Sequence, residues 1–158
     1  MQKRSFLNAA LALMGTSALN TPLAAWATAK PQIEVWKTAS CGCCHDWITH
    51  METNGFELKV HDVTDAAKNT LRAQLGLAEK YGSCHTALIN GYVVEGHVPA
   101  RDLLRLLKER PKALGLTVPG MTVGSPGMDG PEYKGRKDPY AVLLVLRDGS
   151  STIYHAYP

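Results

Sequence analysis

The stretch QIEVWKTASCGCCHDWITHMETNGFELKVHDV, residues 32–63, contains a complete strand–helix–strand unit. Apolar and polar side chains alternate along residues 32–38 and again along residues 56–63, which is typical of β-strands. Between them, residues 45–55 place apolar side chains at helical spacing and end in a glycine. We therefore expect a β-α-β opening in which the helix joins two parallel strands.

Further elements of the same two kinds follow this unit. Residues 65–77 return to helical periodicity, and residues 86–98 form two apolar runs about Asn90-Gly91, which is a strong hairpin signal. Residues 99–111 have the pattern of another helix, with one proline at its start and another at its end. We expect Leu71, Leu75 and Ala78 to lie on one side of the helix predicted at residues 65–77.

The composition changes beyond residue 112. Residues 115–140 are rich in glycine and proline and show neither helical nor strand periodicity, so we expect a long loop that is functional or mobile. Residues 141–158 contain two strand patterns around Asp148-Gly149. The order β-α-β-α-β-β-α predicts an α/β, thioredoxin-like fold, here with an extra C-terminal β-hairpin and a long Gly/Pro/Met loop.

The first 29 residues have the anatomy of a cleaved secretory signal peptide. Two basic residues precede an apolar run at residues 6–14, no acidic residue is present, and residues 25–29 contain two overlapping Ala-x-Ala sites. The apolar run is too short to span a bilayer. We predict that residues 1–29 export the chain to the periplasm and that residues 30–158 form one domain there.

The overall charge excludes two classes of partner. The formal net charge of +3 falls to +1 once the two basic residues of the signal segment are removed. A nearly neutral chain gives no reason to expect binding to nucleic acid or to an acidic membrane surface. In an oxidising compartment, the four cysteines of the chain would by default form two disulfides.

Three of the four cysteines lie within residues 41–44, and the fourth is Cys84. Cys41 and Cys44 have C-x-x-C spacing near a helix N-terminus, which favours thiolate and permits a thiol–disulfide oxidoreductase. A Cys43–Cys44 disulfide would be strained and would stabilise little. In thioredoxin-like proteins a cis-proline normally faces the C-x-x-C motif, whereas this chain has Cys84-His85 at that place. We therefore expect four thiols to converge.

Four neighbouring thiolates need cations to balance their charge. One Zn²⁺ would leave a net charge of −2, whereas four Cu(I) ions would leave none. Adjacent Cys43 and Cys44 point roughly 100° apart on a helix, which suits bridging several ions. Thiolate ligands favour Cu(I), zinc or iron–sulfur clusters, but the spacing matches neither structural zinc sites nor ferredoxins. The sequence therefore predicts a cluster of several Cu(I) ions on Cys41, Cys43, Cys44 and Cys84.

Methionines and histidines are further candidates. Met121 and Met128 end two Pro-Gly-Met units, and thioether sulfur favours Cu(I); alternatively, both side chains are hydrophobic plugs. His45 and His85 adjoin ligand cysteines and either bind metal or donate a hydrogen bond to sulfur. His97 could reach the cluster only if the end of the hairpin faces it, and we favour a surface or core histidine. Solvated side chains are expected for His50, His61 and His155.

Three stretches of the sequence together resemble the CopG-type periplasmic copper-resistance proteins, a family long described as a domain of unknown function. They are WKTASCGCCHDW, SCHTALINGYVVEGHVPARDLLRLL and GLTVPGMTVGSPGM. The resemblance covers nearly all of residues 30–158. It implies a thioredoxin-like copper-binding domain with a cysteine-bridged copper cluster, and interconversion of Cu(I) and Cu(II). It also implies that Cys41, Cys43, Cys44 and Cys84 are the cluster ligands. Thr122 departs from the pattern, in which a proline is expected.

Three functions remain open at this level. The first is copper resistance and homeostasis through a Cu(I) cluster, with or without copper oxidoreductase activity. The second is thiol–disulfide exchange at Cys41 and Cys44. The third is a passive chaperone that hands copper to a periplasmic pump or oxidase. The catalytic residues and the electron donor are not identified by the sequence.

Overall fold

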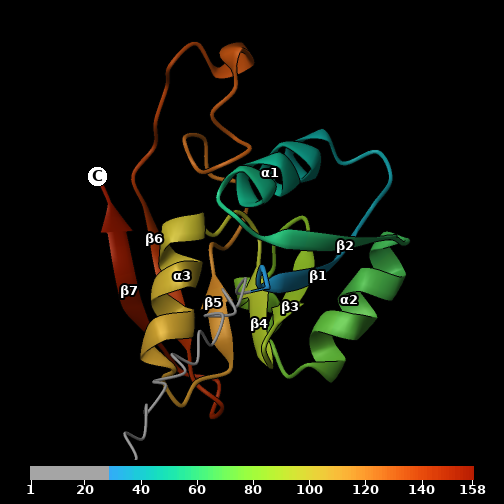
Figure 1. The fold of residues 1–158 in the computed structure, drawn as a ribbon, viewed down its shortest axis with the longest axis vertical. Helices are drawn as coiled ribbons and strands as arrows, with labels where there is room; N and C mark the ends of the chain where they lie inside the picture. Colours follow the sequence, from blue (N-terminus) through green and yellow to red (C-terminus); the bar gives the residue numbers. More distant parts are fainter. Residues whose placement is uncertain (1–28) are drawn as a thin grey trace, which may run out of the picture.

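A seven-stranded mixed sheet organises residues 29–158, the part of the chain that the computed structural model describes (Figure 1). The strand order is β2-β1-β3-β4-β5-β6-β7. The strands are β1 (Gln32–Lys37), β2 (Glu57–Asp62), β3 (Thr86–Ile89), β4 (Tyr92–Glu95), β5 (Gly115–Thr117), β6 (Tyr140–Val145) and β7 (Ser151–Tyr157). The helices are α1 (Gly42–Thr53), α2 (Asp65–Gln74) and α3 (Ala100–Glu109), with 3₁₀ turns at Glu79–Tyr81 and Pro131–Tyr133.

The predicted β-α-β opening and the central hairpin are both confirmed. Strands β1 and β2 are parallel neighbours joined by α1, and β3 runs antiparallel to β1. Strands β3 and β4 are antiparallel and turn at Asn90 and Gly91. Both residues have positive φ, 47° and 81°, as the favoured two-residue hairpin turn requires. Helix α1 begins earlier than predicted, so Cys43 and Cys44 lie in its first turn.

The expectation of an unbroken loop over residues 115–140 was wrong at its start. Residues Gly115–Thr117 form β5, which is parallel to β4 and antiparallel to β6 and so joins the C-terminal hairpin to the main sheet. A three-residue strand is too short to show a period. Glycine is required at residue 115 because a Cβ there would collide with the Val93 carbonyl group.

The most buried side chains of α2 are not the apolar ones that its periodicity indicated. The buried side chains of this helix are Lys68 and Arg72, whereas Leu71 and Leu75 are half-buried and Ala78, beyond the helix, is exposed. Long basic side chains can lie along a packed surface when their charged ends find partners. Both charged ends do so here, at the loop that carries Cys84.

The main hydrophobic core fixes α1 against the sheet. Trp47 and Met51 of α1 are fully buried beside Ile33 and Val35 of β1. The Trp47 indole N–H donates to the Val98 carbonyl oxygen at 2.9 Å and thereby ties α1 to the segment after β4. The first turn of α1 is therefore held in a fixed position over one end of the sheet.

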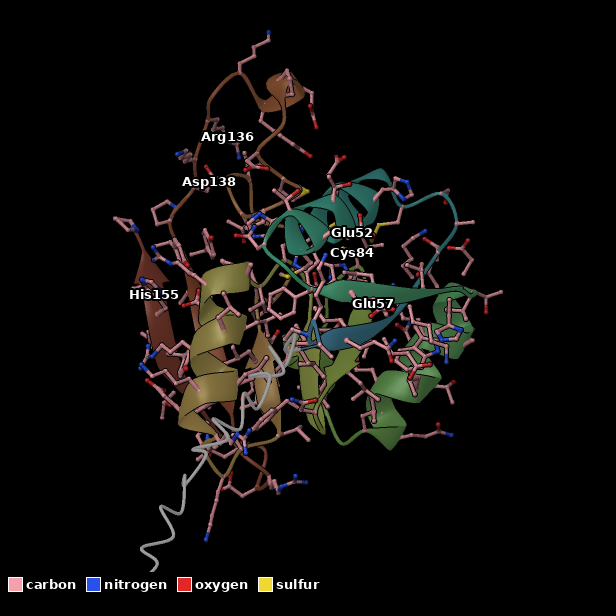
Figure 2. All side chains as sticks on the ribbon, viewed as in Figure 1. Glu52, Glu57, Cys84, Arg136, Asp138 and His155 are labelled. Carbon is pink, nitrogen blue, oxygen red and sulfur yellow. A yellow bond between two sulfur atoms is a disulfide. The ribbon has the colours of Figure 1, made fainter. Side chains whose placement is uncertain are left out.

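Residues 118–139, which we call the 118–139 loop, lie at the same end of the molecule as α1 (Figure 1). Gly127 in this loop has a φ of +84°, and a Cβ there would meet Cys43 O and Trp47 N. The loop backbone thus packs directly on the first turn of α1. Farther along the loop, Arg136 and Asp138 form an exposed ion pair (Figure 2).

The predicted signal peptide falls almost wholly on residues 1–28, which lie outside the described part of the chain. Among the described residues, no helix has the length and apolar character needed to cross a membrane.

Candidate metal centre

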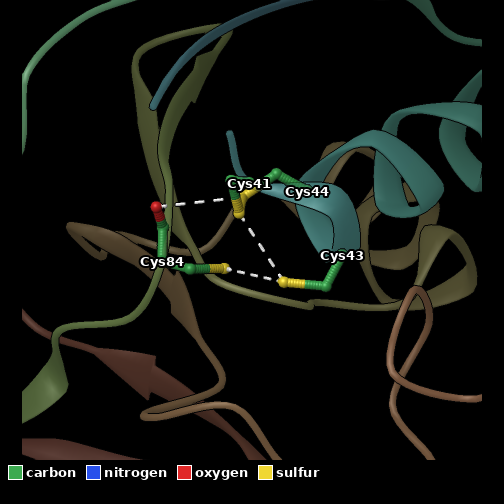
Figure 3. Close-up of side chains that lie close together, drawn as sticks. All are labelled: Cys41, Cys43, Cys44 and Cys84. Atoms are coloured by element: carbon green, nitrogen blue, oxygen red, sulfur yellow. Dashed lines mark hydrogen bonds between the residues drawn. A yellow bond between two sulfur atoms is a disulfide. The ribbon is translucent and has the colours of Figure 1, made fainter. Parts of the chain in front are cut away.

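The first turn of α1 and the loop before β3 bring all four cysteines together (Figure 3). Cys41 caps the N-terminus of α1, and Cys43 and Cys44 follow in its first turn. Cys84 lies opposite, in residues 82–85, which we call the Cys84 loop. The four sulfur atoms lie within 4.8 Å of one another. The predicted convergence of the thiols is therefore present in the fold.

The oxidation state differs from the four free thiolates that we expected. Cys41 and Cys44 form a disulfide, with their Cα atoms 5.3 Å apart, while Cys43 and Cys84 are free thiols. A separation of three residues at a helix N-terminus places two side chains on one face, so C-x-x-C spacing suits this bond. The Sγ of Cys43 lies 3.6 Å from the Sγ of Cys41 and 4.0 Å from that of Cys84.

His97 reaches the cysteines, although we expected a histidine of the surface or core. It is buried, and its Nε2 lies 2.9 Å from the Sγ of Cys84. Its Nδ1 lies 2.7 Å from the Pro126 carbonyl oxygen. Because a carbonyl oxygen can only accept, Nδ1 carries the proton and the lone pair of Nε2 faces Cys84.

The hairpin register contains the signal that would have located His97. A two-residue turn at Asn90-Gly91 pairs Thr86 with Glu95, as the structure shows. Continuing that register by two residues places His97 opposite Cys84. The Gly96 N–H donates to the His85 carbonyl oxygen at 3.0 Å, which agrees with this continuation.

His85 is the second imidazole of the site. Its side chain is fully buried, its Nδ1 lies 3.4 Å from the Sγ of Cys84, and its ring stacks at a tilt on Trp47. The Nε2 atom of His85 has no hydrogen-bond partner among the described residues. Buried polar atoms are nearly always paired, so an unpaired one on an imidazole that contacts the Cys84 sulfur leaves that imidazole open to a further partner or ligand.

Burial controls the protonation of these groups. It lowers the pKa of His85 well below its usual range, with a smaller contribution from neighbouring His97, and it also lowers the pKa of His97. Burial, followed by the nearby Cys43 sulfur, raises the pKa of the Cys84 thiol to about 12. Burial therefore favours the neutral forms of Cys84, His85 and His97 in the metal-free site.

Two basic side chains of α2 hold the Cys84 loop. The Lys68 ammonium donates to the Cys84 carbonyl oxygen at 2.9 Å, and Arg72 donates to the Ser83 carbonyl oxygen at 2.9 Å. Arg72 also pairs with the buried Glu95 carboxylate, which accepts a hydrogen bond from the Ser83 N–H at 2.7 Å. The backbone of this loop is therefore clamped from two sides.

The loop methionines differ from each other. Met128 is buried, and its sulfur accepts a hydrogen bond from the Tyr133 hydroxyl at 3.3 Å, which favours the role of a hydrophobic plug. Met121 is 57% exposed, and the adjacent Gly120 carbonyl oxygen accepts a hydrogen bond from the Ser83 hydroxyl. Met121 thus lies on a segment tied to the Cys84 loop.

His45, which we expected to bind metal or to hydrogen-bond a ligand sulfur, is exposed at the start of α1. The other three histidines only partly match their expected solvation. His50 is half-buried and accepts from the Ala100 N–H at 3.1 Å, and His155 bonds to buried Asp102 at 2.7 Å, so the expectation was wrong for both. His61 is partly exposed and bonds to Glu34. These three bond to groups outside the cysteine site.

Comparison with known proteins gives two kinds of match. The family model described as "Protein of unknown function, DUF411" matches residues 81–128. Two solved structures, Form 2 and Form 1 of "Copper resistance protein copG", are each 44% identical in sequence, with TM-scores of 0.74 and 0.73. Each match covers 82% of this chain, and 99% and 98% of the respective solved chains. No curated protein sequence matches.

Proposed function

Because this chain belongs to the family of the copper resistance protein CopG, we propose that it is a periplasmic copper-binding protein of copper resistance that holds several Cu(I) ions on a cysteine-bridged cluster. The observation that carries the proposal is the convergence of Cys41, Cys43, Cys44 and Cys84 within 4.8 Å. Sulfur and imidazole are ligands that Cu(I) prefers. Copper is then the cargo of the site rather than a resident cofactor.

Copper loading requires the reduced form of the site. The Cys41–Cys44 disulfide must accept two electrons before all four sulfurs can act as thiolates. Reduction of the disulfide yields two thiolates, which become thiols only if they take up protons. The Cys43 and Cys84 thiols, and either of the released sulfurs that is protonated, then lose protons as Cu(I) binds. His85 and His97, both neutral and both next to Cys84, are placed either to bind copper or to orient the Cys84 sulfur.

The proposal includes export and a thioredoxin-like core. The composition of residues 1–29 supports a signal peptide that is removed, leaving residues 30–158 in the periplasm. The elements from β1 to α3 follow the order β-α-β-α-β-β-α, with neighbouring strands β2-β1-β3-β4, which supports the thioredoxin-like class. N-terminal sequencing of the protein recovered from the periplasm tests the cleavage site.

Anaerobic titration of the reduced protein with Cu(I) tests the cluster. We expect saturation at more than one copper ion per chain, because four thiolates can bridge several ions. Cys84→Ser should lower the stoichiometry, whereas Thr53→Ala, at the exposed end of α1, should leave it unchanged. Saturation of the native protein at one copper ion or none would contradict the proposal.

The disulfide between Cys41 and Cys44 favours a second candidate function, thiol–disulfide exchange. This function predicts reduction of insulin by the metal-free protein, lost in Cys41→Ser and retained in Cys84→Ser. Interconversion of Cu(I) and Cu(II) would join the two functions, since thiols next to the metal can supply electrons. A passive chaperone would instead transfer Cu(I) to a pump or an oxidase without any change in its thiol content.

A further inference from the structure

The four sulfur atoms form one compact cluster rather than a bonded pair with two unrelated thiols. Cys41 is bonded to Cys44, and the Sγ of Cys43 lies 3.6 Å from that of Cys41 and 4.0 Å from that of Cys84. Cys43 thus lies next to a disulfide sulfur on one side and a free thiol on the other (Figure 3). Oxidation of Cys41 and Cys44 leaves the second pair of thiols still able to react.

We propose that Cys43 and Cys84 are a second redox pair. The four cysteines of a chain then hold four more electrons as four thiols than as two disulfides. The inference deepens the proposed function, and its copper step rests on that function. The bond would link the first turn of α1 to the Cys84 loop, 41 residues apart in sequence. A disulfide needs its two sulfurs about 2.05 Å apart, so the side chains must approach by about 2 Å.

The Cys84 loop determines which motion can bring the two sulfurs together. Residues 82–85 belong to neither a helix nor a strand, while their backbone is fixed by Lys68 and Arg72. Rotation of the two side chains, rather than movement of the loop, is therefore the motion required. The Nε2 lone pair of His97, 2.9 Å from the Cys84 sulfur, is placed to accept the proton that leaves this thiol.

The oxidation balances when Cu(II) is the acceptor. The two thiols lose two protons and two electrons as the S–S bond forms, and two Cu(II) ions each take one electron and become Cu(I). With both pairs, a fully reduced chain reduces four Cu(II) ions. Each disulfide also removes two copper ligands, so electron donation and retention of Cu(I) compete at the same sulfurs.

The contacts between the sulfurs also permit disulfide exchange without net oxidation. Attack of the Cys43 thiolate on the Cys41 sulfur would form a Cys41–Cys43 bond and release Cys44 as a thiolate. Attack of Cys84 on Cys43 would then form the Cys43–Cys84 bond and release Cys41. A single disulfide can therefore move to the second pair, which would free both cysteines of the C-x-x-C spacing.

The test is to oxidise the fully reduced protein under anaerobic conditions with excess Cu(II), in the presence of a chromogenic Cu(I) chelator. We expect four Cu(I) ions per native chain, and peptide mass spectrometry without reduction should find Cys41–Cys44 and Cys43–Cys84 bonds. Cys84→Ser should stop at two Cu(I) ions with the Cys41–Cys44 bond alone. Diamide, a thiol oxidant that contains no metal, should produce the same two bonds in the native protein.

Three results would overturn the inference. They are two Cu(I) ions per native chain with Cys43 and Cys84 still open to alkylation, a bond from Cys84 to a cysteine other than Cys43, and a Cys84 bond between two chains. Failure of the proposed function is distinguishable from these. A chain that forms both disulfides with diamide but does not bind Cu(I) keeps the redox pair and loses the copper cluster.

Discussion

The cysteine–histidine site and a second polar cluster both gather ionisable side chains around buried residues, but they differ in how fully their atoms are paired. The second cluster, which we call the Asp102 cluster, comprises Asp102 and Arg101 of α3 with His155 and Tyr157 of β7. Asp102 accepts from His155 at 2.7 Å and from Tyr157 at 2.6 Å. Arg101 donates to the Tyr157 hydroxyl at 2.7 Å and to His155 Nε2 at 2.6 Å.

The cysteine–histidine site has no such closed set of bonds. His85 Nε2 is unpaired among the described residues, and the free sulfurs meet only weak partners at 3.4 to 4.0 Å apart from the contact with His97. Figure 2 shows Cys84 and His155 in separate parts of the molecule. A cluster that satisfies its own atoms holds elements together, whereas one that leaves donors and acceptors unused is suited to a ligand.

Asp102→Ala gives the largest effect that this comparison predicts. It leaves His155 and Tyr157 without their shared acceptor. The loss of two hydrogen bonds to a charged group costs about 3 kcal/mol. We expect the free energy of unfolding, measured by urea denaturation, to fall by that amount while Cu(I) stoichiometry stays native. A parallel loss of copper binding in a folded variant would show that the Asp102 cluster is not only a brace.

The two regions should limit stability at opposite ends of the pH scale. Burial lowers the pKa of His85 and His97, so the folded chain holds them neutral while the unfolded chain protonates them near pH 6.5. Stability of the metal-free protein is then complete above pH 6.5 and falls below it, by at most about 1.4 kcal/mol per pH unit for each histidine.

At the Asp102 cluster the sign is reversed. Burial raises the pKa of Tyr157 above its usual 10.0, so its contribution is complete below pH 10 and is lost as the pH rises through the folded value. Urea unfolding from pH 5.5 to 11 measures both limits. Tyr157→Phe should weaken the alkaline loss and leave the acid loss unchanged. An acid loss that vanishes together with Tyr157 would contradict the assignment.

The sequence predicted the convergence of the four cysteines because each lies at a recognisable boundary of a strand or helix. The same pattern could not show that Cys41 and Cys44 pair while Cys43 stays free, since that depends on side-chain directions in the first turn of α1. The contact of His97 with Cys84 was considered but not favoured, although the two-residue hairpin turn determines the register of these two residues. Strand pairing, rather than residue type, carried that information.

The buried face of α2 was unpredictable for a different reason. Periodicity identifies apolar faces, but Lys68 and Arg72 are buried because their charged ends bind carbonyl oxygens of the Cys84 loop. Those acceptors become neighbours only when α2 packs beside β3. In the same way, β5 could not be recognised before β4 and β6 were present on its two sides.

Lys68→Met tests whether the clamp on the Cys84 loop serves the cysteine–histidine site. Loss of the ammonium removes the donor to the Cys84 carbonyl oxygen and one buried positive charge near the thiolates. We expect Cu(I) affinity, measured by competition with a chelator, to fall about tenfold, or about 1.4 kcal/mol. Lys68→Arg should recover part of this loss, and Lys59→Met, at a surface ion pair with Glu34, should cause none. Native affinity in folded Lys68→Met would make the clamp irrelevant to copper.

His85→Leu should produce the smallest change in stability and the one with the most informative sign. Replacing an imidazole whose buried Nε2 is unpaired removes a desolvation penalty, so the metal-free protein should keep its free energy of unfolding or gain about 1 kcal/mol. Cu(I) affinity should nevertheless fall, because the imidazole beside the Cys84 sulfur is lost. His61→Leu, on the exposed face of β2, is the matched control and should change neither quantity much. A variant that loses stability and keeps its copper affinity would show that His85 is a structural side chain, like those of the Asp102 cluster. The stability of the metal-free protein and its affinity for copper are opposed only where the fold leaves a polar atom unpaired.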